Sequence, residues 1–345
     1  MWALGYFFSL ALLFQGILAD TECPNVSTIE DRRADKKRLR IVQYNIEWMF
    51  IDYCAASDCP GDGCSWKNVS EAQTHMNYVT KVIKDLNPDI INFCEIEGCD
   101  ELNMLKSSLG GESSGYMPYL KKGKDTGTGQ NVGMLTRVDP LISLYRTEDK
   151  YSYPITGSTC GYIGNITETG VSKHYITEFN FGETNVAFIA AHLIALPTDP
   201  PRCAQREAQA SILQKVIYNY VEKKYEIIMM GDLNDFDANV LDVNNNKPKS
   251  LTIDILTGLK GDYAGKYELF NVAGMLGQEE RYSEWYNSDK NCNTESKKDY
   301  SMIDHILVTE NIKKNIESVS IYHGYEEYCG TYNSDHFPVI IDLGL

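Results

Sequence analysis

The stretch YEIIMMGDLNDFD, residues 225–237, runs from a block of apolar residues into Asp232, Asn234, Asp235 and Asp237. Its first half has the length and composition of a buried β-strand, and its second half has the Gly, Asn and Asp residues that are common in turns. Apolar runs of this kind recur at 39–46, 89–96, 131–137, 173–181, 185–194, 302–309 and 337–343. Several of them also end in polar residues. The stretch is therefore part of a repeated pattern and not an isolated acidic turn.

Two helices are expected between these strands. Ser70 and Gln73 match a capping box, after which an apolar helix face continues until Pro88. The second helix is expected from about Cys203 to Lys223. Many strands with few helices indicate an α/β fold with two packed sheets covered by helices. Because no repeat or linker divides the chain, we expect one large domain over 39–345, preceded by a charged arm over 20–38.

The first 19 residues, MWALGYFFSLALLFQGILA, carry no charge, and a polar chain begins at Asp20. The apolar segment is short for a membrane-spanning helix and ends in a small residue, as secretory signal peptides do. We predict a signal peptide over 1–19, with an uncleaved signal anchor as the alternative. No later segment approaches a membrane-spanning length, so stable membrane insertion is not expected.

Cysteines and sequons also favour export. All ten cysteines follow the predicted cleavage site, and an even number in an exported chain predicts disulfides of undetermined connectivity. In the Cys-rich loop at 52–66 a disulfide is favoured over zinc, because the spacings exceed C-x2-C and no histidine lies among them. Sequons at Asn25, Asn68 and Asn165 are typical of a secreted glycoprotein, released outside the cell or into an acidic secretory compartment.

The net charge of -16 disfavours tight, metal-free binding of a polyanion. A site that binds divalent cations can supply positive charge locally. The composition is therefore compatible with metal-assisted cleavage of nucleic acid.

Polar side chains suited to cation binding and proton transfer fall in or beside the apolar runs. They are Asn45, Glu95, His192, Asp232, Asn234, Asp304, Asp335 and His336. Each one alone is more often structural, as a turn residue, a surface carboxylate or a buried histidine. Together they supply oxygen ligands for a hard cation and histidines that transfer protons near neutral pH.

Glu95, with Asn45 and Asp335, is expected to hold Mg²⁺, because hard cations prefer oxygen ligands and use few carboxylates. The two histidines would act as general base and general acid.

Asp304 is expected to orient His336, the general base, by accepting its second ring proton. His192 is then the general acid. Asp232 and Asn234 would position the nucleophile and a phosphate oxygen.

In chain order, QYNIE, CEIE, AAHL, GDLND, MIDHILV and SDHFPV resemble the motifs of the endonuclease/exonuclease/phosphatase superfamily, the fold of deoxyribonuclease I. The resemblance covers residues 41–343, and GDLN and SDHFP are its most specific members. It implies a four-layer α/β/β/α sandwich of two mainly antiparallel sheets, with the site at the strand ends. It also implies hydrolysis of phosphate esters with Mg²⁺, or with Mn²⁺ or Ca²⁺ in its place. The metal and catalytic positions named above match those of the family.

The stretch HLIALPTDPPRCAQREAQA, residues 192–210, is similar to a pattern of secreted bacterial-type extracellular nucleases. Arg206 and Gln209 are the matching positions. They would either support the site or lie on the surface of a helix.

Two departures from the pancreatic-type enzymes affect the site. Glu97 stands where those enzymes have a phosphate-binding arginine, and Gln130 falls near the place of the glutamate that pairs with the first histidine. Gln130 can accept a hydrogen bond from His192 but cannot stabilise an imidazolium by charge. Lys173 would replace the lost positive charge, or it is an ordinary surface lysine.

Three functions remain open: a nuclease with DNA favoured, a phospholipid phosphodiesterase on the same site, and a noncatalytic binding protein. A lipid enzyme should expose aromatic residues, for which Trp285 and Tyr286 are weak candidates. A noncatalytic protein should lack central residues, and all of them are present. The sequence does not predict the oligomeric state.

Overall fold

The computed structural model describes residues 22–57, 59–60, 64–287, 297–325 and 332–345. The predicted signal peptide lies outside these ranges, and the predicted domain limits stay predictions. Within the described ranges, no helix combines the length and the hydropathy needed to cross a bilayer.

Six strands form the first sheet, in the order β14-β15-β1-β2-β4-β3. β1 and β2 are parallel, and the other neighbours are antiparallel. The strands are β1 Arg38–Met49, β2 Ile90–Ile96, β3 Met117–Leu120, β4 Asn131–Thr136, β14 Ile316–Ile321 and β15 Val339–Gly344.

Five strands form the second sheet, in the order β10-β13-β9-β8-β7. β8 and β9 are parallel, and the other pairs are antiparallel. The strands are β7 His174–Phe181, β8 Thr184–Ala191, β9 Glu226–Asp232, β10 Phe270–Asn271 and β13 Asp304–Val308.

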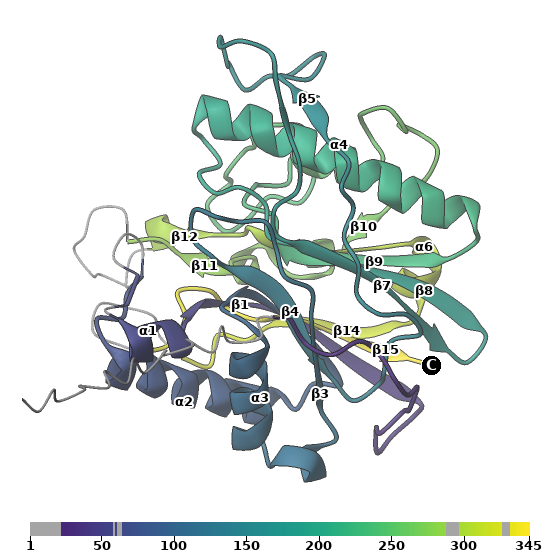
Figure 1. Cartoon of the computed structure of the whole chain (residues 1–345). Helices are drawn as coiled ribbons and strands as arrows, with labels where there is room; N and C mark the ends of the chain where they lie inside the picture. The colour runs from purple at the N-terminus through teal and green to yellow at the C-terminus, as the bar shows by residue number, and fades with distance from the viewer. Residues whose placement is uncertain (1–21, 58, 61–63, 288–296, 326–331) are drawn as a thin grey trace, which may run out of the picture.

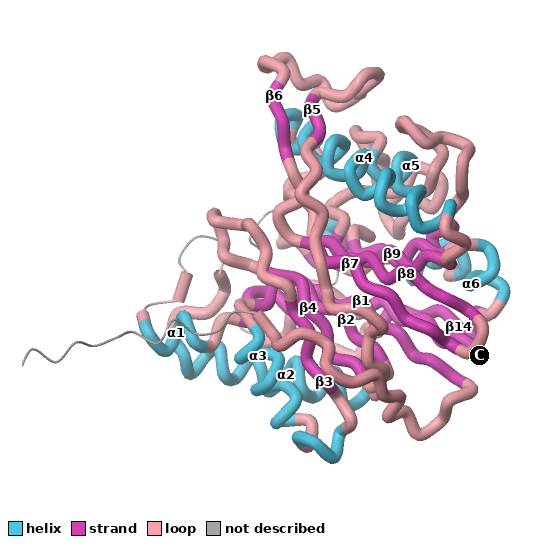
Figure 2. Tube along the Cα trace, turned by 45° about the vertical axis from the view of Figure 1, so that its right-hand side comes forward, coloured by secondary structure: helices cyan, strands magenta, loops and turns pink. Residues whose placement is uncertain are grey.

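The two sheets pack face to face between two helical layers (Figures 1 and 2). Helices α2 (Val69–Leu86) and α3 (Cys99–Ser108) cover the first sheet, and α4 (Pro200–Glu222) covers the second. Successive strand residues alternate between layers, since Met230 faces the core between the sheets while Met229 packs in the cluster that includes α4 residues. The predicted α/β/β/α sandwich is therefore confirmed.

Shorter elements join these layers. Strands β5 and β6 pair as a hairpin that projects beyond α4 (Figure 2), and β11 pairs with β12. The helices are α1 Asp52–Ala56, α5 Thr252–Leu256 and α6 Glu310–Lys314, and the short strands are β5 Tyr151–Tyr153, β6 Thr167–Thr169, β11 Glu284–Trp285 and β12 Tyr300–Ser301. The 3-10 helices are η1 Gly111–Ser114, η2 Val272–Met275, η3 Gln278–Glu280 and η4 Lys297–Asp299.

The strand directions bring distant segments to one edge. The parallel strands β1 and β2 end at the edge where their antiparallel neighbour β15 begins. In the other sheet β8 and β9 end where β13 begins, since Asp304 pairs with Asp232. At this point β9 passes very close to β8: a Cβ added to Gly231 would lie 1.7 Å from the Ala191 carbonyl oxygen, and the φ of Gly231 is +150°. Only glycine fits there.

Both predicted helices exist, but their first residues differ from the prediction. The side chain of Asn68 accepts hydrogen bonds from the backbone N–H groups of Ser70 and Glu71, so α2 begins at Val69 and the predicted capping box at Ser70 is wrong. Helix α4 begins three residues before Cys203, because Asp199 caps it and proline, which fits the first turn, occupies its start.

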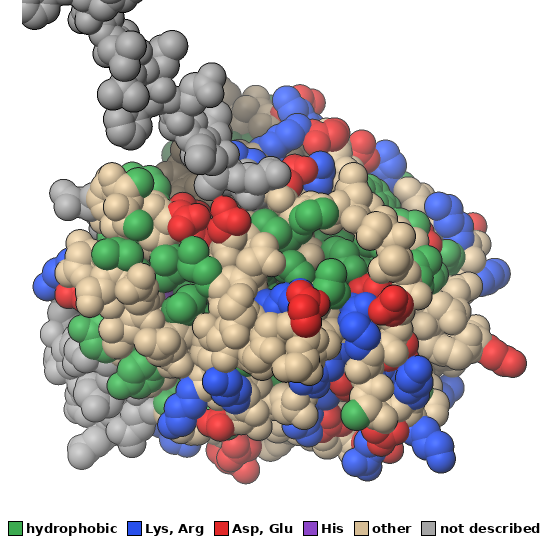
Figure 3. Space-filling model, turned by 60° about the horizontal axis from the view of Figure 1, so that its bottom comes forward, with side chains coloured by type: hydrophobic (Ala, Val, Ile, Leu, Met, Phe, Trp, Pro, Cys, Tyr) green, Lys and Arg blue, Asp and Glu red, His purple; other side chains and the backbone are tan. Residues whose placement is uncertain are grey.

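The described part of the chain contains three disulfides, Cys23–Cys99, Cys54–Cys59 and Cys160–Cys203. Disulfide formation is confirmed, and in the loop at 52–66 the Cys54–Cys59 bond agrees with the preference for a disulfide over zinc. Three sequon asparagines, at 25, 68 and 165, are exposed. On the described part of the face shown in Figure 3, basic and acidic side chains are interspersed and form no broad basic patch.

Candidate functional site

The predicted site residues gather at the shared edge of the two sheets. Asn45 and Glu95 come from the ends of β1 and β2, and His192 and Asp232 come from the ends of β8 and β9. Asp304 begins β13, and Asp335 and His336 precede β15 by a few residues. Six of these eight predicted side chains are nearly or fully buried: Asn45, His192, Asp232, Asn234, Asp304 and His336.

His336 is held by a buried carboxylate. Asp304 Oδ2 lies 2.7 Å from His336 Nδ1, and Asp304 Oδ1 accepts a hydrogen bond from Gln43 Nε2 at 3.1 Å. Burial alone would lower the pKa of His336. The charge and hydrogen bond of Asp304, with the charges of Asp335 and Asp232, outweigh it and raise the pKa well above the usual value. The contact fixes a proton on Nδ1 and turns Nε2 toward the other site residues.

Asn45 connects the two sheets at the centre of the site. Its Nδ2 lies 3.0 Å from Asp232 Oδ2, 3.3 Å from Glu95 Oε1 and 3.4 Å from His336 Nε2. Burial, then the charge of Asp304, raises the pKa of Asp232 to about 8. The side chain of one asparagine thus fixes the spacing of two carboxylates and the histidine ring.

Asn234 lies in the loop after β9 with a left-handed φ of 51°, which asparagine tolerates. Its backbone N–H donates to Asp232 Oδ1 at 3.0 Å, and its Nδ2 donates to the Leu193 carbonyl oxygen at 3.1 Å. The side chain therefore ties the loop after β9 to the loop that follows His192. Its Oδ1 has no hydrogen-bond donor among the described residues.

Two further carboxylates, which were not assigned from the sequence, belong to the same site. Glu47 Oε2 accepts a hydrogen bond from the Asp335 N–H at 3.1 Å, and burial, with the charge of Glu95, raises the pKa of Glu47 to about 7. Glu284 forms a β-bridge with His336, and its Oε2 accepts a hydrogen bond from Ser301 at 2.6 Å. Glu47 lies where β1 is irregular, with a left-handed φ of 46°, so the alternation of a regular strand could not have placed its side chain in the site.

Several carboxylates gather around His336. Asp335 is 35% exposed, and its pKa is raised well above the usual value by desolvation and then by the charge of Glu47. Carboxylates that raise one another's pKa leave a local excess of negative charge that a cation would offset. In the described residues, no three His, Cys, Asp or Glu side chains form a complete metal-binding group. A cation bound here would share few protein ligands, as Mg²⁺ commonly does with water and substrate oxygens.

His192 lies beside Asp232 and Glu95. Its Nε2 is 3.6 Å from Asp232 Oδ2 and 3.9 Å from Glu95 Oε1, and its Nδ1 has no hydrogen-bond partner within the described ranges. Burial, then the charges of Lys173 and His336, lowers the pKa of His192 well below its usual value. The imidazole is therefore neutral near pH 7.

Gln130 does not accept a hydrogen bond from His192, contrary to the expectation. Gln130 Oε1 instead accepts one from Lys173 Nζ at 3.1 Å, and Lys173 Nζ also lies 3.5 Å from Asp125 Oδ2. Lys173 is only 8% exposed, so the alternative of an ordinary surface lysine is wrong. Its backbone oxygen accepts the His192 N–H at 2.9 Å, which places the lysine beside the histidine.

Arg206 and Gln209 point inward from α4, so the alternative of helix-surface residues is also wrong. Arg206 is fully buried, pairs with Asp235 Oδ2 at 2.9 Å and donates to the carbonyl oxygens of Ile194 and Pro197 at 3.0 Å each. Gln209 accepts the Ile194 N–H at 3.1 Å. Both side chains hold the loop that follows His192.

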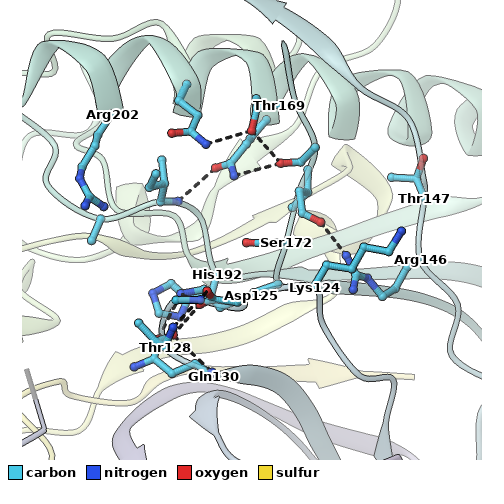
Figure 4. Close-up of a pocket in the computed structure, with 18 of the residues that line it drawn as sticks. Lys124, Asp125, Thr128, Gln130, Arg146, Thr147, Thr169, Ser172, His192 and Arg202 are labelled. Carbon is cyan, nitrogen blue, oxygen red and sulfur yellow. Dashed lines mark hydrogen bonds and ion pairs between the residues drawn. The ribbon is translucent and has the colours of Figure 1, made fainter. Parts of the chain in front are cut away.

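A cleft of about 730 Å³ opens beside His192 (Figure 4). Glu95, Gln130, Lys173 and His192 line its inner end. From there it extends below the N-terminal half of α4. The site is thus open to a ligand of substantial size on the side of His192.

An α/β/β/α sandwich with carboxylates and two histidines gathered at one edge of its sheets is an arrangement suited to phosphate-ester hydrolysis. Residues 65–336 match the family described as Endonuclease/Exonuclease/phosphatase family. The chain belongs to this family, whose members are phosphoesterases and nucleases that typically use divalent metal ions. A search of curated protein sequences found no match.

Solved structures share the fold at low sequence identity. A variant of the Neisseria 3′ phosphatase NExo, bound to a product DNA hairpin, is 13% identical with a TM-score of 0.56, covering 88% of this chain and 99% of its own. A Bacteroides vulgatus endonuclease/exonuclease/phosphatase is 17% identical with a TM-score of 0.54, covering 89% and 99%. Humanized D. rerio TDP2 is 15% identical with a TM-score of 0.52, covering 90% and 100%. These similarities concern the fold.

Proposed function

We propose that this chain is a secreted, divalent-metal-dependent phosphodiesterase that cleaves nucleic acid internally, with DNA as the favoured substrate. The observation that carries the proposal is the buried Asp304–His336 pair beside a cluster of carboxylates. Membership of a family of phosphoesterases and nucleases supports the reaction class.

His336 acts as the general base in this proposal. Asp304 keeps the ring proton on Nδ1, so the lone pair of Nε2 is available to take a proton from an attacking water. The raised pKa of His336 depends on the charges of Asp304, Asp335 and Asp232. A cation that offsets part of this charge would favour the neutral base.

Glu95 and Asp335, joined by Glu47, are the carboxylates that would hold the cation. Asn45 would join them only through its Oδ1, which accepts the Glu47 N–H at 3.0 Å, because its Nδ2 faces Glu95 and Asp232. Mg²⁺, or Mn²⁺ or Ca²⁺ in its place, would polarise a phosphate oxygen and neutralise negative charge there. Asp232, with Asn234, positions the nucleophile and a phosphate oxygen. Asp232 is held for this role because it accepts hydrogen bonds from Asn45 Nδ2 and from the backbone N–H of Asn234.

His192 is the general acid on the leaving-group side. Burial and the charge of Lys173 disfavour an imidazolium there, whereas a bound phosphate brings a negative charge that favours it. The acid role of His192 therefore depends on bound substrate. Lys173 supplies the positive charge that the arginine of pancreatic-type enzymes would supply.

A nucleic-acid substrate is supported by the neighbour NExo, whose structure contains a product DNA hairpin. A phospholipid substrate has less support, because Trp285 is only 5% exposed, so that of the two candidate aromatics Tyr286 alone is exposed. Secretion is supported by the three disulfides, since such bonds are rare in proteins of reducing compartments.

Nicking of supercoiled plasmid by the purified chain tests the proposal. We expect nicking with Mg²⁺, none with EDTA, and loss of nicking in His336→Ala. A plasmid and a single-stranded DNA that both stay intact with Mg²⁺ and with Mn²⁺, across acidic to mildly alkaline pH, would contradict the proposed DNA cleavage.

A further inference from the structure

The cleft beside His192 continues well past the proposed catalytic residues. Its far walls come from the loop around Lys124, from residues 146–150, from the base of the β5–β6 hairpin and from the start of α4. Figure 4 shows Arg202 across the cleft from Lys124 and Arg146, with His192 lying lower than Arg202. A substrate that places a phosphate at His192 would extend into this space.

The basic side chains that line the cleft differ in whether they already have hydrogen-bond or ion-pair partners. Lys124 pairs with Glu148, Lys173 pairs with Asp125, and Arg146 donates to two backbone carbonyl oxygens. Arg202 and Lys150 are exposed, and neither side chain has a hydrogen-bond or ion-pair partner in the described part of the chain. These two cations are free to bind an anionic group.

Polar side chains also line the inner end of the cleft. His192, Gln130 and Lys173 lie there. The Nδ1 atom of His192 is buried, so a ligand in the cleft would meet the accessible part of the ring and not this atom. The cleft therefore has polar side chains at both ends.

Size and charge limit what the cleft can hold. A volume of about 730 Å³ falls within the range of clefts for drug-sized ligands, roughly 300–1,000 Å³, which suits a few nucleotides and is small for a duplex. Five acidic residues also line it: Glu95, Asp125, Glu148, Asp149 and Glu168. Five basic residues line it as well, so the cleft has no excess of positive charge with which to hold the closely spaced phosphates of a duplex backbone.

We infer that this cleft binds single-stranded nucleotides adjacent to the scissile phosphate, with Arg202 contacting a phosphate one or more nucleotides away. The inference rests on the proposed function and adds the strandedness of the substrate and a residue that binds it. Arg202 contributes binding and takes no part in bond cleavage.

The test compares Arg202→Ala with Arg38→Ala on three substrates: bis(4-nitrophenyl) phosphate, a single-stranded hexanucleotide and a blunt duplex of the same sequence. Arg38 is a control for the loss of one exposed arginine away from the cleft: it starts β1 and, unlike Arg202, pairs with a carboxylate, Glu317, at 2.9 Å. We expect Arg202→Ala to raise the KM for the hexanucleotide about tenfold, as loss of one charged hydrogen bond does, with kcat unchanged. Neither variant should alter the KM of the small diester.

Salt dependence and charge rescue separate a phosphate contact from a structural defect. Loss of one phosphate contact should reduce the slope of log affinity against log salt by about 0.7 for single strands. Arg202→Lys, which keeps the charge, should restore most of the affinity. An unchanged KM for the hexanucleotide in Arg202→Ala, an equal rise in KM for the small diester, or duplex cleavage as efficient as single-strand cleavage would overturn the inference.

Failure of the proposed function can be distinguished from failure of the inference about the cleft. If none of these diesters is hydrolysed, the proposed function has failed, and anisotropy of a fluorescein-labelled hexanucleotide with Mg²⁺ still tests the cleft. About tenfold weaker binding by Arg202→Ala than by Arg38→Ala would support the inference. Equal affinities would overturn it.

Discussion

Replacing Asp304 by asparagine should inactivate His336 while leaving the fold intact. In the native site Asp304 Oδ2 accepts the Nδ1 proton of His336 at 2.7 Å, and Oδ1 accepts from Gln43 at 3.1 Å. Asparagine can keep the Gln43 contact through its carbonyl oxygen, but its NH₂ group then faces Nδ1. The imidazole must carry its proton on Nε2, where the base needs a lone pair. We expect kcat to fall by about 10²–10⁴-fold, the usual contribution of general acid–base catalysis.

The assay is hydrolysis of a chromogenic phosphodiester under single-turnover conditions, with Asp304→Asn, His336→Ala and the double variant. Because the two residues act as one unit, the double variant should lose little more activity than His336→Ala alone. Urea denaturation checks the fold, which the hydrogen bond from the Asp304 N–H to Ser283 Oγ at 2.9 Å helps to retain. A kcat for Asp304→Asn close to that of wild type, or losses that multiply in the double variant, would refute the reasoning.

Three other outcomes follow from the structure. Gly231→Ala should lower the free energy of unfolding in urea by at least about 1–3 kcal/mol, because its Cβ would lie 1.7 Å from the Ala191 oxygen; a stable variant would contradict this close approach. Burial lowers the pKa of His174 to about 3, so its contribution to stability is complete above the unfolded pKa and is lost as pH falls toward 3. His174→Gln keeps an acceptor for the Thr147 N–H, and between about pH 7.5 and 4.5 it should lose roughly 2 kcal/mol less stability than wild type; equal losses would argue against a neutral buried histidine. Lys173→Ala should lower kcat/KM for a small phosphodiester about tenfold or more, and Lys173→Arg should lower it less; equal effects would show that the charge is not used.

The central strands could be predicted because each is a block of apolar residues bounded by turn formers. Two strands of the first sheet were missed. β3 has only four residues and contains Pro118, which weakens a strand pattern. β14 is an edge strand with half-exposed residues, so its sequence IESVSI lacks a clear apolar block.

The site residues likewise divide into those that the sequence predicts and those that it does not. The ordered motifs placed eight polar residues at strand ends, and the strand directions bring them to one edge. Glu284 could not be found this way, because it lies in a two-residue strand and reaches the site only through its bridge to His336. Gln130 was expected to accept a hydrogen bond from His192. Side-chain packing decides whether its amide oxygen accepts from His192 or from Lys173, and in the structure Lys173 is the donor. Pairings of this kind are set by tertiary contacts, which sequence patterns do not record.

The most direct test of a metal-dependent site at this edge is the Mg²⁺ dependence of phosphodiester hydrolysis by wild type and Glu95→Gln. Glutamine keeps the shape of Glu95 and an acceptor for the Trp48 N–H, which donates to Glu95 at 3.1 Å, but it removes one negative charge. The proposal predicts no hydrolysis in EDTA, recovery with Mg²⁺, and a half-maximal Mg²⁺ concentration at least about tenfold higher for Glu95→Gln. Hydrolysis that persists in EDTA, or identical Mg²⁺ dependence in the two proteins, would contradict it.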